Sequence, residues 1–309
     1  VQWDFSTPNE EYFKHVDRFL KMAAEKDFLV MLVPCYLGYF TDPDQGWWDE
    51  VRSEHNSPQK MRNYGEFLGK RYKDTPNILW IAGGDNDAKG VDEAYMRNLI
   101  EGIKTYDKSH LWTGHFCNTS GNFWSTYNPL YREIMDIDGH YVWEEGSLGD
   151  KGPQYVTELE QYHKGKMIIQ LDQSYEHDVP HAADNENPQW IRRKMYDGLL
   201  SGCAGTSFSS GTLDNQASWF KDWKPLMDTY GMKQVALCFK LFDTLPWYKF
   251  IPDTTDKIIS EGRGEFRSID YICADEEAFL TRRDAQQFDV ISCSVDLSGV
   301  VTPSGEGAT

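Results

Sequence analysis

The chain lacks an excess of basic residues, and this absence limits its partners. Its 309 residues include 31 Lys and Arg against 49 Asp and Glu, which gives a formal net charge of −18. Nucleic acids and anionic membranes are bound through basic patches, so we expect neither as a partner. Neutral and cationic ligands remain compatible with this charge.

Long apolar runs are also absent. No stretch approaches the ~20 apolar residues of a membrane-spanning helix, and no signal-peptide pattern opens the sequence. The first residue is Val1 rather than methionine. We therefore expect a processed or truncated amino end, whose export signal the sequence does not show.

Cysteine is scarce and widely spaced. The six cysteines show no CxxC spacing, which argues against a zinc site and against a disulfide framework. They are Cys35, Cys117, Cys203, Cys238, Cys273 and Cys293. Aromatic residues, in contrast, are abundant, with 11 Trp and 17 Tyr. The flat faces of sugars are commonly held on such rings, although most of them are expected to fill the core.

The stretch from Ile78 to Asp87, with the sequence ILWIAGGDND, is the most informative part of the chain. Its uninterrupted apolar run suits a strand covered on both faces, and Gly83 and Gly84 let the backbone approach a ligand closely. Asp85 is then expected at the carboxyl end of this strand, where α/β sheets keep their ligands. The same Gly-Gly-Asp-Asn sequence is also typical of an ordinary turn.

Helical and strand patterns alternate from residue 8 to about residue 243, which predicts parallel βαβ units. The predicted strands cover 28–34, 78–84, 111–116, 136–142, 167–172 and 205–210, and the predicted helices cover 8–26, 58–72, 91–106, 155–163 and 187–200. We expect an α/β fold, a (β/α)8 TIM barrel over residues 1–245. The chain opens on a helix, begun by a capping box from Thr7 to Glu10, so the two further strands of such a barrel are expected from before residue 1.

The pattern changes after Pro246. Short strand-like pieces at 257–259, 268–274, 278–282 and 288–295 are separated by Gly, Asp and Glu. They predict a small, antiparallel, partial β-sandwich-like module over residues 246–309. The chain ends in a tail with the composition of a disordered segment.

Two of the predicted strands end in a single carboxylate. If residues 28–34 form the third strand of the barrel, Asp85 and Asp172 follow strands four and seven and face each other across one mouth. A glycosidase needs such a pair, because one acid protonates the leaving oxygen while the other attacks the sugar or activates water. The alternative is that one or both acids cap the next helix or pair with Arg or Lys.

Several runs resemble a known family. They are YGEFLGKRYKDTPNILWIAGGD from Tyr64 to Asp85, NEEYFKHVD from Asn9 to Asp17, AAEKDFLVMLVP, SGCAGTSF, and LFDTLPWYKFIPD from Leu241 to Asp253. Together they are similar to the apiosidase-like family of glycoside hydrolases. The resemblance implies a barrel enzyme, often with a small C-terminal collagen-binding-like β domain, typical of gut Bacteroidetes and acting on plant or other complex polysaccharides. It also implies a secreted protein, periplasmic or extracellular.

The resemblance implies roles for three acids. The acid after the double glycine looks like the general acid/base of the family, and here it is Asp85. The family pattern at strand seven is a Gly-Glu-Pro turn followed by a Tyr-Glu pair. Tyr175 and Glu176 match the pair, so Asp172 falls on the position of the nucleophile. An aspartate there is one methylene shorter than glutamate, and Glu176 is the fallback nucleophile.

Residues at strand ends and in loops are the candidates for substrate binding. His115 and His140 fall where the family has histidines facing the pocket, and the aromatic residues are candidates for stacking on sugars. The full set is Tyr36, Trp47, Trp48, His115, Asn118, His140, Tyr141, Trp143, Tyr175 and Trp219.

Three functions remain open from the sequence. The first is a glycoside hydrolase with an oligosaccharide or polysaccharide substrate, which requires no cofactor. The second is a non-catalytic carbohydrate-binding barrel, in which the altered 171–174 segment has abolished the chemistry. The third is a lyase or isomerase with a divalent cation held by Asp85, Asp138 and Asp172, since oxygen ligands suit magnesium or calcium. The sequence does not determine the oligomeric state.

Overall fold

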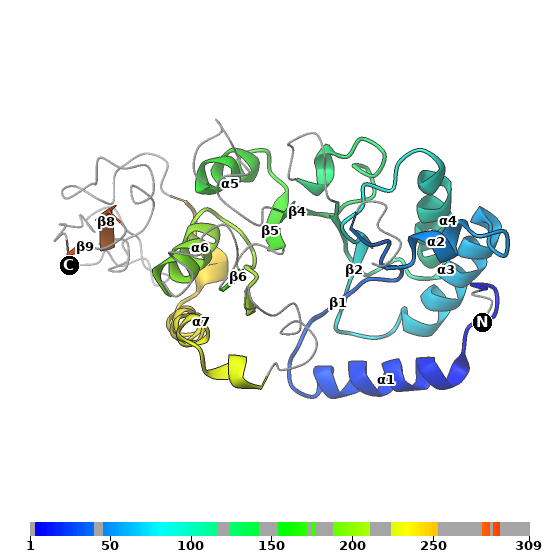
Figure 1. Ribbon diagram of the computed structural model, residues 1–309, viewed down its shortest axis with the longest axis horizontal. Coiled ribbons are helices and arrows are strands. Elements are labelled where there is room, and N and C mark those ends of the chain that lie inside the picture. The colour runs from blue at the N-terminus through cyan, green and yellow to red at the C-terminus, as the bar shows by residue number, and fades with distance from the viewer. Residues whose placement is uncertain are drawn as a thin grey trace. The chain divides into compact units, whose positions relative to one another are not determined.

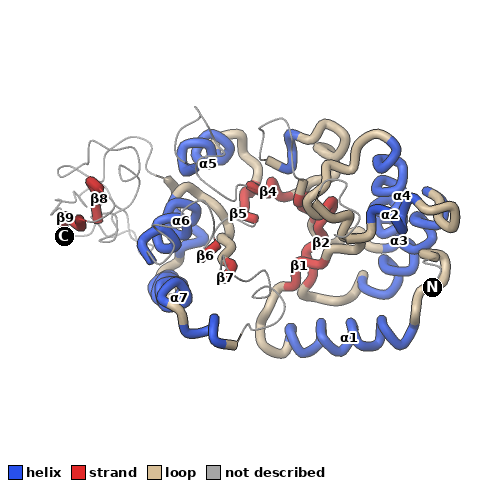
Figure 2. The backbone as a smooth tube through the Cα atoms, viewed as in Figure 1, coloured by secondary structure: helices blue, strands red, loops and turns tan. Residues whose placement is uncertain are grey.

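Helices and strands alternate along the chain (Figures 1 and 2). The computed structural model describes residues 4–39, 46–116, 124–141, 154–171, 175–176, 188–210, 224–252, 280–284 and 287–290. Contacts divide the chain into two units, Val1–Tyr141 and Val142–Thr309, which are taken in turn. Within the described ranges, no helix has both the length and the apolarity to cross a membrane.

The first unit is built on parallel strands. Its strands are β1 (Val30–Leu32), β2 (Ile78–Gly83), β3 (Trp112–His115) and β4 (Ile137–Tyr141). β1 pairs with β2 and β2 pairs with β3, in a register that sets Trp80 opposite Trp112. Because these pairs are parallel, the carboxyl ends of β1, β2 and β3 lie along one edge of the sheet.

Helices connect these strands. They are α1 (Glu10–Ala24), α2 (Trp48–Arg52), α3 (Pro58–Tyr72) and α4 (Val91–Tyr106), with a short 3-10 helix η1 (Ser125–Tyr127). α3 leads from β1 to β2 and α4 leads from β2 to β3, and Figure 1 shows the two helices side by side. α3 begins as the sequence predicts, because the Ser57 hydroxyl accepts the Lys60 N–H at 3.2 Å and Pro58 occupies the first turn.

Glycines allow α3 and α4 to pack with their backbones close together. A methyl group on Gly65 would lie 2.2 Å from the carbonyl oxygen of Leu99, and one on Gly69 would lie 2.4 Å from that of Ile103. From the opposite helix, a methyl group on Gly102 would lie 2.2 Å from the carbonyl oxygen of Arg62. The absence of side chains at these three positions therefore sets the distance between the helices.

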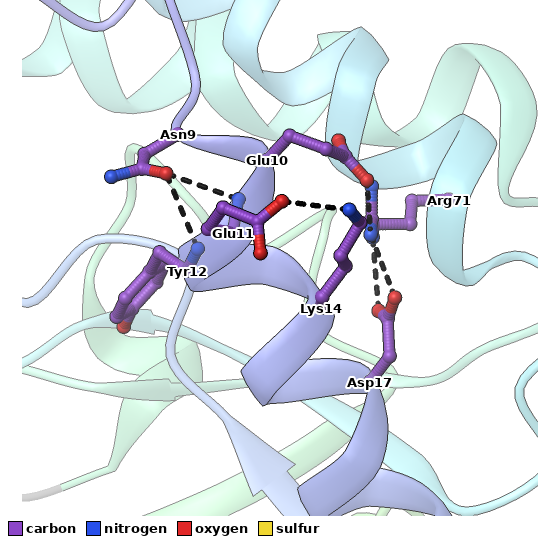
Figure 3. A network of polar contacts seen from close by, with 7 residues as sticks. All are labelled: Asn9, Glu10, Glu11, Tyr12, Lys14, Asp17 and Arg71. Carbon is purple, nitrogen blue, oxygen red and sulfur yellow. Dashed lines mark hydrogen bonds and ion pairs between the residues drawn. The ribbon is translucent and has the colours of Figure 1, made fainter.

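The first helix begins two residues later than predicted. Asn9 is its N-cap, and the Asn9 Oδ1 accepts the backbone N–H groups of Glu11 at 3.0 Å and Tyr12 at 3.3 Å (Figure 3). The prediction that Thr7 caps this helix is therefore wrong. The Asn9 side chain satisfies two of the backbone N–H groups that have no partner within the helix, so the helix starts without a cap from Thr7.

Arg71 joins α3 to α1. Its guanidinium donates to both oxygens of Glu10, at 2.9 and 3.0 Å, and to both oxygens of Asp17, at 2.9 and 2.6 Å (Figure 3). The hydrogen bonds from Arg71 hold the pKa of the Asp17 carboxyl below its ordinary value. The same contacts raise the pKa of Arg71. These bidentate contacts with two acids of α1 tie this helix to the last turn of α3.

A buried polar group lies beneath the strands, at the end opposite their carboxyl edge. Trp80 and Trp112 stack at 5.7 Å, and the Trp80 indole N–H donates to Asp107 at 2.8 Å. The Nδ1 of His110 lies 2.7 Å from the same carboxylate. Burial raises the pKa of Asp107, but the hydrogen bonds from Trp80 and His110 outweigh burial and bring this pKa below its ordinary value. Asp107, the residue that follows α4, thus ties the end of this helix to Trp80 of β2.

The second unit continues the alternation. Its elements are α5 (Gln154–Tyr162), β5 (Met167–Leu171), β6 (Tyr175–Glu176), α6 (Pro188–Leu200), β7 (Ser209–Ser210), the 3-10 helices η4 (Pro225–Asp228) and η5 (Trp247–Lys249), α7 (Tyr230–Phe242), β8 (Leu280–Asp284) and β9 (Gln287–Val290). β6 and β7 pair in parallel. α6 and α7 share an apolar core that includes Met195, Leu199, Cys238 and Phe242.

The predicted elements differ from the structure mainly at their ends. The helix over 91–106 is confirmed, whereas the strand predicted over 205–210 is regular only at Ser209 and Ser210. The preceding segment instead makes single bonds to β5, since the Gly205 carbonyl oxygen accepts the Gln170 N–H at 3.0 Å. The helix α7 was not among the predicted elements.

The C-terminal module is described only in part. β8 and β9 pair antiparallel and overlap two of the predicted strands. The other two predicted strands, 257–259 and 268–274, lie outside the described residues. The domain boundary near residue 245 stays a prediction.

Candidate active site

Asp85 follows β2 at the carboxyl edge of the first sheet. All residues of β2 are buried, and the chain then turns through three residues in the left-handed region, Gly83 at φ 88°, Gly84 at φ 91° and Asp85 at φ 53°. Glycine adopts this region freely, whereas an aspartate pays a modest conformational cost there. The turn directs the Asp85 carboxylate away from the strand and toward the neighbouring strand ends.

Tyr36 contacts this carboxylate from the segment after β1. Its hydroxyl donates to the Oδ2 of Asp85 at 2.5 Å. The segment runs beside the glycine turn, because the Leu37 N–H donates to the Gly83 carbonyl oxygen at 3.3 Å and the Gly38 N–H donates to that of Gly84 at 3.1 Å. The pairing of β1 with β2 thus continues past the strand ends and delivers the phenol to the acid.

His115, the last residue of β3, lies on the other side of Asp85. The Asp85 backbone N–H donates to the His115 Nδ1 at 3.4 Å, and Nδ1 is 3.5 Å from the Asp85 Oδ1. A backbone N–H can only donate, so this contact fits the histidine tautomer that carries its proton on Nε2. The edge of the imidazole also contacts the Tyr141 ring, with centroids 4.4 Å apart.

The two carboxylate oxygens of Asp85 differ in their surroundings. The side chain is only 16% exposed. Oδ1 is buried and accepts no hydrogen bond from the residues that the structure describes, whereas Oδ2 accepts the Tyr36 hydroxyl. The acid is therefore partly withdrawn from water and held by one strong donor.

A second buried group surrounds Asp138 in β4. Asp138 accepts the Ser125 hydroxyl at 3.0 Å and both the backbone N–H and the hydroxyl of Thr126 at 2.8 Å. His140, two residues further on, is fully buried and stacks on Trp124 with centroids 4.0 Å apart and planes 5° apart. Asp138 thus holds the η1 segment against β4, and its oxygens are engaged by Ser125 and Thr126.

The two neighbouring tryptophans have different environments. Trp47 is 37% exposed and meets Phe5 edge to face. Trp48 has the guanidinium of Arg52 4.3 Å above its ring, and its indole N–H donates to Asp92 at 3.0 Å. Trp48 is therefore engaged by the protein itself, while Trp47 keeps an open surface.

The remaining site candidates belong to the second unit or are not described. Tyr175 and Glu176 form β6, and their backbones pair with Ser209 and Ser210 of β7. Asp172, Asn118, Trp143 and Trp219 lie outside the described residues. The functional roles of all these residues stay predictions.

Gln170 anchors the strand that leads to the second predicted acid. Its amide donates to Glu158 at 2.8 Å and to the Lys194 carbonyl oxygen at 3.3 Å, and its own oxygen accepts the Thr206 hydroxyl. A methyl group on Gly198 would lie 2.2 Å from the Gln170 Nε2, so α6 approaches this amide closely. The sequence did not lead us to expect a role for Gln170. The one signal for it was a polar residue within an apolar strand.

The sequence also gave no indication of Trp124, Ser125 and Thr126. They come from a segment without helical or strand periodicity. Their role arises from their contacts with Asp138 and His140 of β4. Tyr36 was expected as a stacking residue, and its bond to Asp85 joins residues 49 positions apart. Such pairings depend on the tertiary fold and leave no spacing in the sequence.

The first unit has parallel strands joined by helices, and polar side chains gather where these strands end. This arrangement is typical of α/β enzymes, which have their site at the carboxyl edge of the sheet. The family model of the apiosidase-like catalytic domain matches residues 1–249. The chain therefore belongs to the apiosidase-like family, as its sequence motifs indicated.

Solved structures agree with this assignment at the level of the fold. A protein described as a glycoside hydrolase matches with a TM-score of 0.58 at 24% identity, over 83% of this chain and 60% of its own. A glycoside hydrolase family 5 protein from Bacteroides vulgatus ATCC 8482 matches with a TM-score of 0.59 at 22% identity, over 83% of this chain and 58% of its own. The mixed α/β fold with parallel strands is thus consistent with a TIM-barrel-like architecture.

The chain spans about three fifths of the length of these two structures. Among curated proteins, none matches the sequence.

Proposed function

We propose that the protein cleaves a glycosidic bond in a complex plant or microbial polysaccharide by a two-carboxylate mechanism. The observation that carries this proposal is the geometry of Asp85, a largely buried acid at the end of a parallel strand, held between Tyr36 and His115. Membership of the apiosidase-like family supports it.

In this mechanism Asp85 is the general acid/base. It protonates the glycosidic oxygen as the bond to the leaving sugar breaks, and the second carboxylate attacks the anomeric carbon or activates a water. Asp172 is the first candidate for the second carboxylate and Glu176 is the alternative. The reaction requires no cofactor.

The same proposal assigns β1 to the third strand of an eight-stranded barrel. Within the described residues β1 pairs only with β2, which leaves its other edge open. The two apolar residues that lead into β1 are exposed, Phe28 at 63% and Leu29 at 61%. Two further strands before β1 would cover this surface, and β2 would then be strand four, the strand that ends in Asp85.

Hydrolysis of a panel of plant and microbial glycans tests the proposal. The wild type is compared with Asp85→Asn, Asp172→Asn and Glu176→Gln, with glycan binding measured in parallel. We expect Asp85→Asn and one of the other two variants to lose ~10³-fold or more in kcat while binding is retained. Wild-type protein that binds a glycan but releases no sugar would favour the carbohydrate-binding alternative instead.

Asp87→Asn is the matched control for Asp85→Asn. It removes the same charge two residues away, from a carboxylate whose Oδ2 is paired with Lys89 at 3.0 Å. Its activity is expected to stay within about threefold of the wild type, since it leaves the Asp85 carboxylate and its contacts with Tyr36 and His115 in place. Equal losses in Asp85→Asn and Asp87→Asn would mean that the loop, and not the acid, is sensitive.

The metal-dependent lyase or isomerase receives less support. It needs Asp138 as a ligand, and both oxygens of Asp138 already accept hydrogen bonds from Ser125 and Thr126. Activity measured with and without a chelator on the same glycan panel separates this alternative from hydrolysis by two carboxylates.

A further inference from the structure

We propose that Tyr36 is a positioning residue for Asp85 and that it acts on the substrate only through this acid. The inference rests on the proposed function of Asp85 and extends it. It also replaces the expectation that Tyr36 stacks on a sugar ring, for reasons that concern the ring, the hydroxyl and the backbone of this residue.

The ring of Tyr36 is already in contact with the protein. A methyl group on Gly84 would lie 2.3 Å from its Cδ2, 3.0 Å from its Cε2 and 3.2 Å from its Cγ. These three atoms span one side of the phenol, so that side rests on the backbone of Gly84. The glycine lets the ring come close enough for its hydroxyl to reach the next residue, Asp85.

The hydroxyl of Tyr36 selects one oxygen of the acid. It donates to Oδ2 at 2.5 Å, while Oδ1 is buried on the His115 side. A phenol that donates to a carboxylate stabilises its charged form and fixes its orientation. Tyr36 keeps its own proton throughout, and the proton that reaches the leaving sugar comes from Asp85.

The backbone around Tyr36 has little freedom to move. The Leu37 and Gly38 N–H groups donate to the carbonyl oxygens of the glycine turn, and the Tyr36 carbonyl oxygen accepts the Trp47 N–H at 2.9 Å. A methyl group on Gly46 would lie 2.5 Å from the Gly38 nitrogen, which shows how closely the next segment packs. Tyr36 is thus held on both of its backbone sides, as a positioning residue needs to be.

The variant Tyr36→Phe tests the inference, because it keeps the ring and removes the hydroxyl. We expect kcat on a hydrolysed glycan to fall about 10- to 100-fold with KM changed less than about threefold, the effect of losing one hydrogen bond to a charged group. A raised KM with unchanged kcat would overturn the inference in favour of sugar stacking.

Tyr64→Phe is the matched control. The Tyr64 hydroxyl donates to the Pro34 carbonyl oxygen at 3.2 Å, so its removal loosens the same segment without touching Asp85. We expect its kcat and its KM to remain close to those of the wild type. If Tyr64→Phe reproduces the loss of kcat seen in Tyr36→Phe, the role of Tyr36 is only structural and the inference fails.

A readout without turnover separates this inference from the proposed function. Carbon-13 labelled aspartate gives a carboxyl signal for Asp85, assigned by its loss in Asp85→Asn. Its chemical shift reports the hydrogen bond from Tyr36 to this carboxylate. The chemical shift of this signal should change in Tyr36→Phe and not in Tyr64→Phe. If the signal shifts but no glycan is hydrolysed, the proposed function fails and the positioning role stands. If Asp85→Asn is inactive while Tyr36→Phe changes neither signal nor kcat, the positioning role fails and the function stands.

Discussion

The ring of Tyr36 occupies the space that a side chain on Gly84 would need, with 2.3 Å between the nearest pair of atoms. Gly84→Ala is therefore expected to displace the phenol from Asp85. Its kcat should fall at least as far as that of Tyr36→Phe, about 10-fold or more, because the same hydrogen bond is lost. Steady-state kinetics on a hydrolysed glycan, with a thermal melt of each variant, measure the effect.

Gly90→Ala is the control for backbone strain in this prediction. Gly90 also has a positive φ, of 67°, but a methyl group there would meet nothing within 4 Å. Both variants place alanine at a positive φ, and the strain is greater at Gly90, whose ψ of −125° lies outside the left-handed helical region. Only Gly84→Ala should lose activity in the folded protein, and an equal loss in Gly90→Ala would contradict the explanation.

The position of Asp85 could be predicted from sequence because its causes are local. An apolar run ends in two glycines, and the structure has a buried strand that ends in a left-handed turn at the same residues. The start of α3 at Ser57 and Pro58 was local in the same sense. Such signals involve residues within one or two turns of each other.

The partners of Asp85 could not be predicted, because they come from other strands. Tyr36 and His115 lie 49 and 30 positions away, and they meet the acid only when the three strands align in register. The environment of Trp48 shows the same limit. The sequence offered two adjacent tryptophans, and only the packing of α4 reveals that Asp92 holds one of them.

Substitutions of Trp47 and Trp48 are expected to affect different properties of the protein. Trp48→Phe removes the donor to Asp92, a mostly buried carboxylate, and should lower the free energy of unfolding by about 1–2 kcal/mol. Trp47→Ala removes an open aromatic surface and should raise the Kd for a bound glycan about three- to tenfold. Chemical denaturation and glycan titration of both variants check this. Weaker glycan binding in Trp48→Phe alone would reverse the assignment.

Gly102→Ala should destabilise the protein, against the usual preference of helices. Alanine in a helix interior is normally favoured over glycine by about 1 kcal/mol. Here the added methyl group would lie 2.2 Å from the carbonyl oxygen of Arg62 and force α3 and α4 apart. Overpacking of this kind costs about 1–3 kcal/mol, so the melting temperature should fall.

Asn98→Ala is the control on the same helix. Within the part of the chain that the structure describes, the Asn98 amide donates to the Ala94 carbonyl oxygen of its own helix. This variant should show the intrinsic preference for alanine, with an unchanged or slightly higher melting temperature. A higher melting temperature for Gly102→Ala as well would mean that the helices can separate without cost.

The link between Arg71 and Asp17 predicts how stability depends on pH. The pKa of Asp17 in the folded protein lies below its ordinary value of 3.8, with the Arg71 hydrogen bonds as the largest cause. A lowered folded pKa contributes stability that is complete above the unfolded value and is lost as the pH falls through the folded value. Asp17→Asn should therefore reduce stability near neutral pH and flatten its decline below about pH 4.

The size of this effect is limited by solvent. The Asp17 side chain is 42% exposed, so Asp17→Asn should cost about 1 kcal/mol or less at pH 7. Glu11→Gln on the same helix is the control, because the Glu11 side chain is 81% exposed and, among the described residues, its ion pair is with Lys14 of its own helix. Denaturant melts of the two variants between pH 3 and pH 7 make the comparison. Parallel curves for Asp17→Asn and the wild type across this range would show that Arg71 does not stabilise the charged carboxylate, since an intact ion pair must weaken on protonation of Asp17.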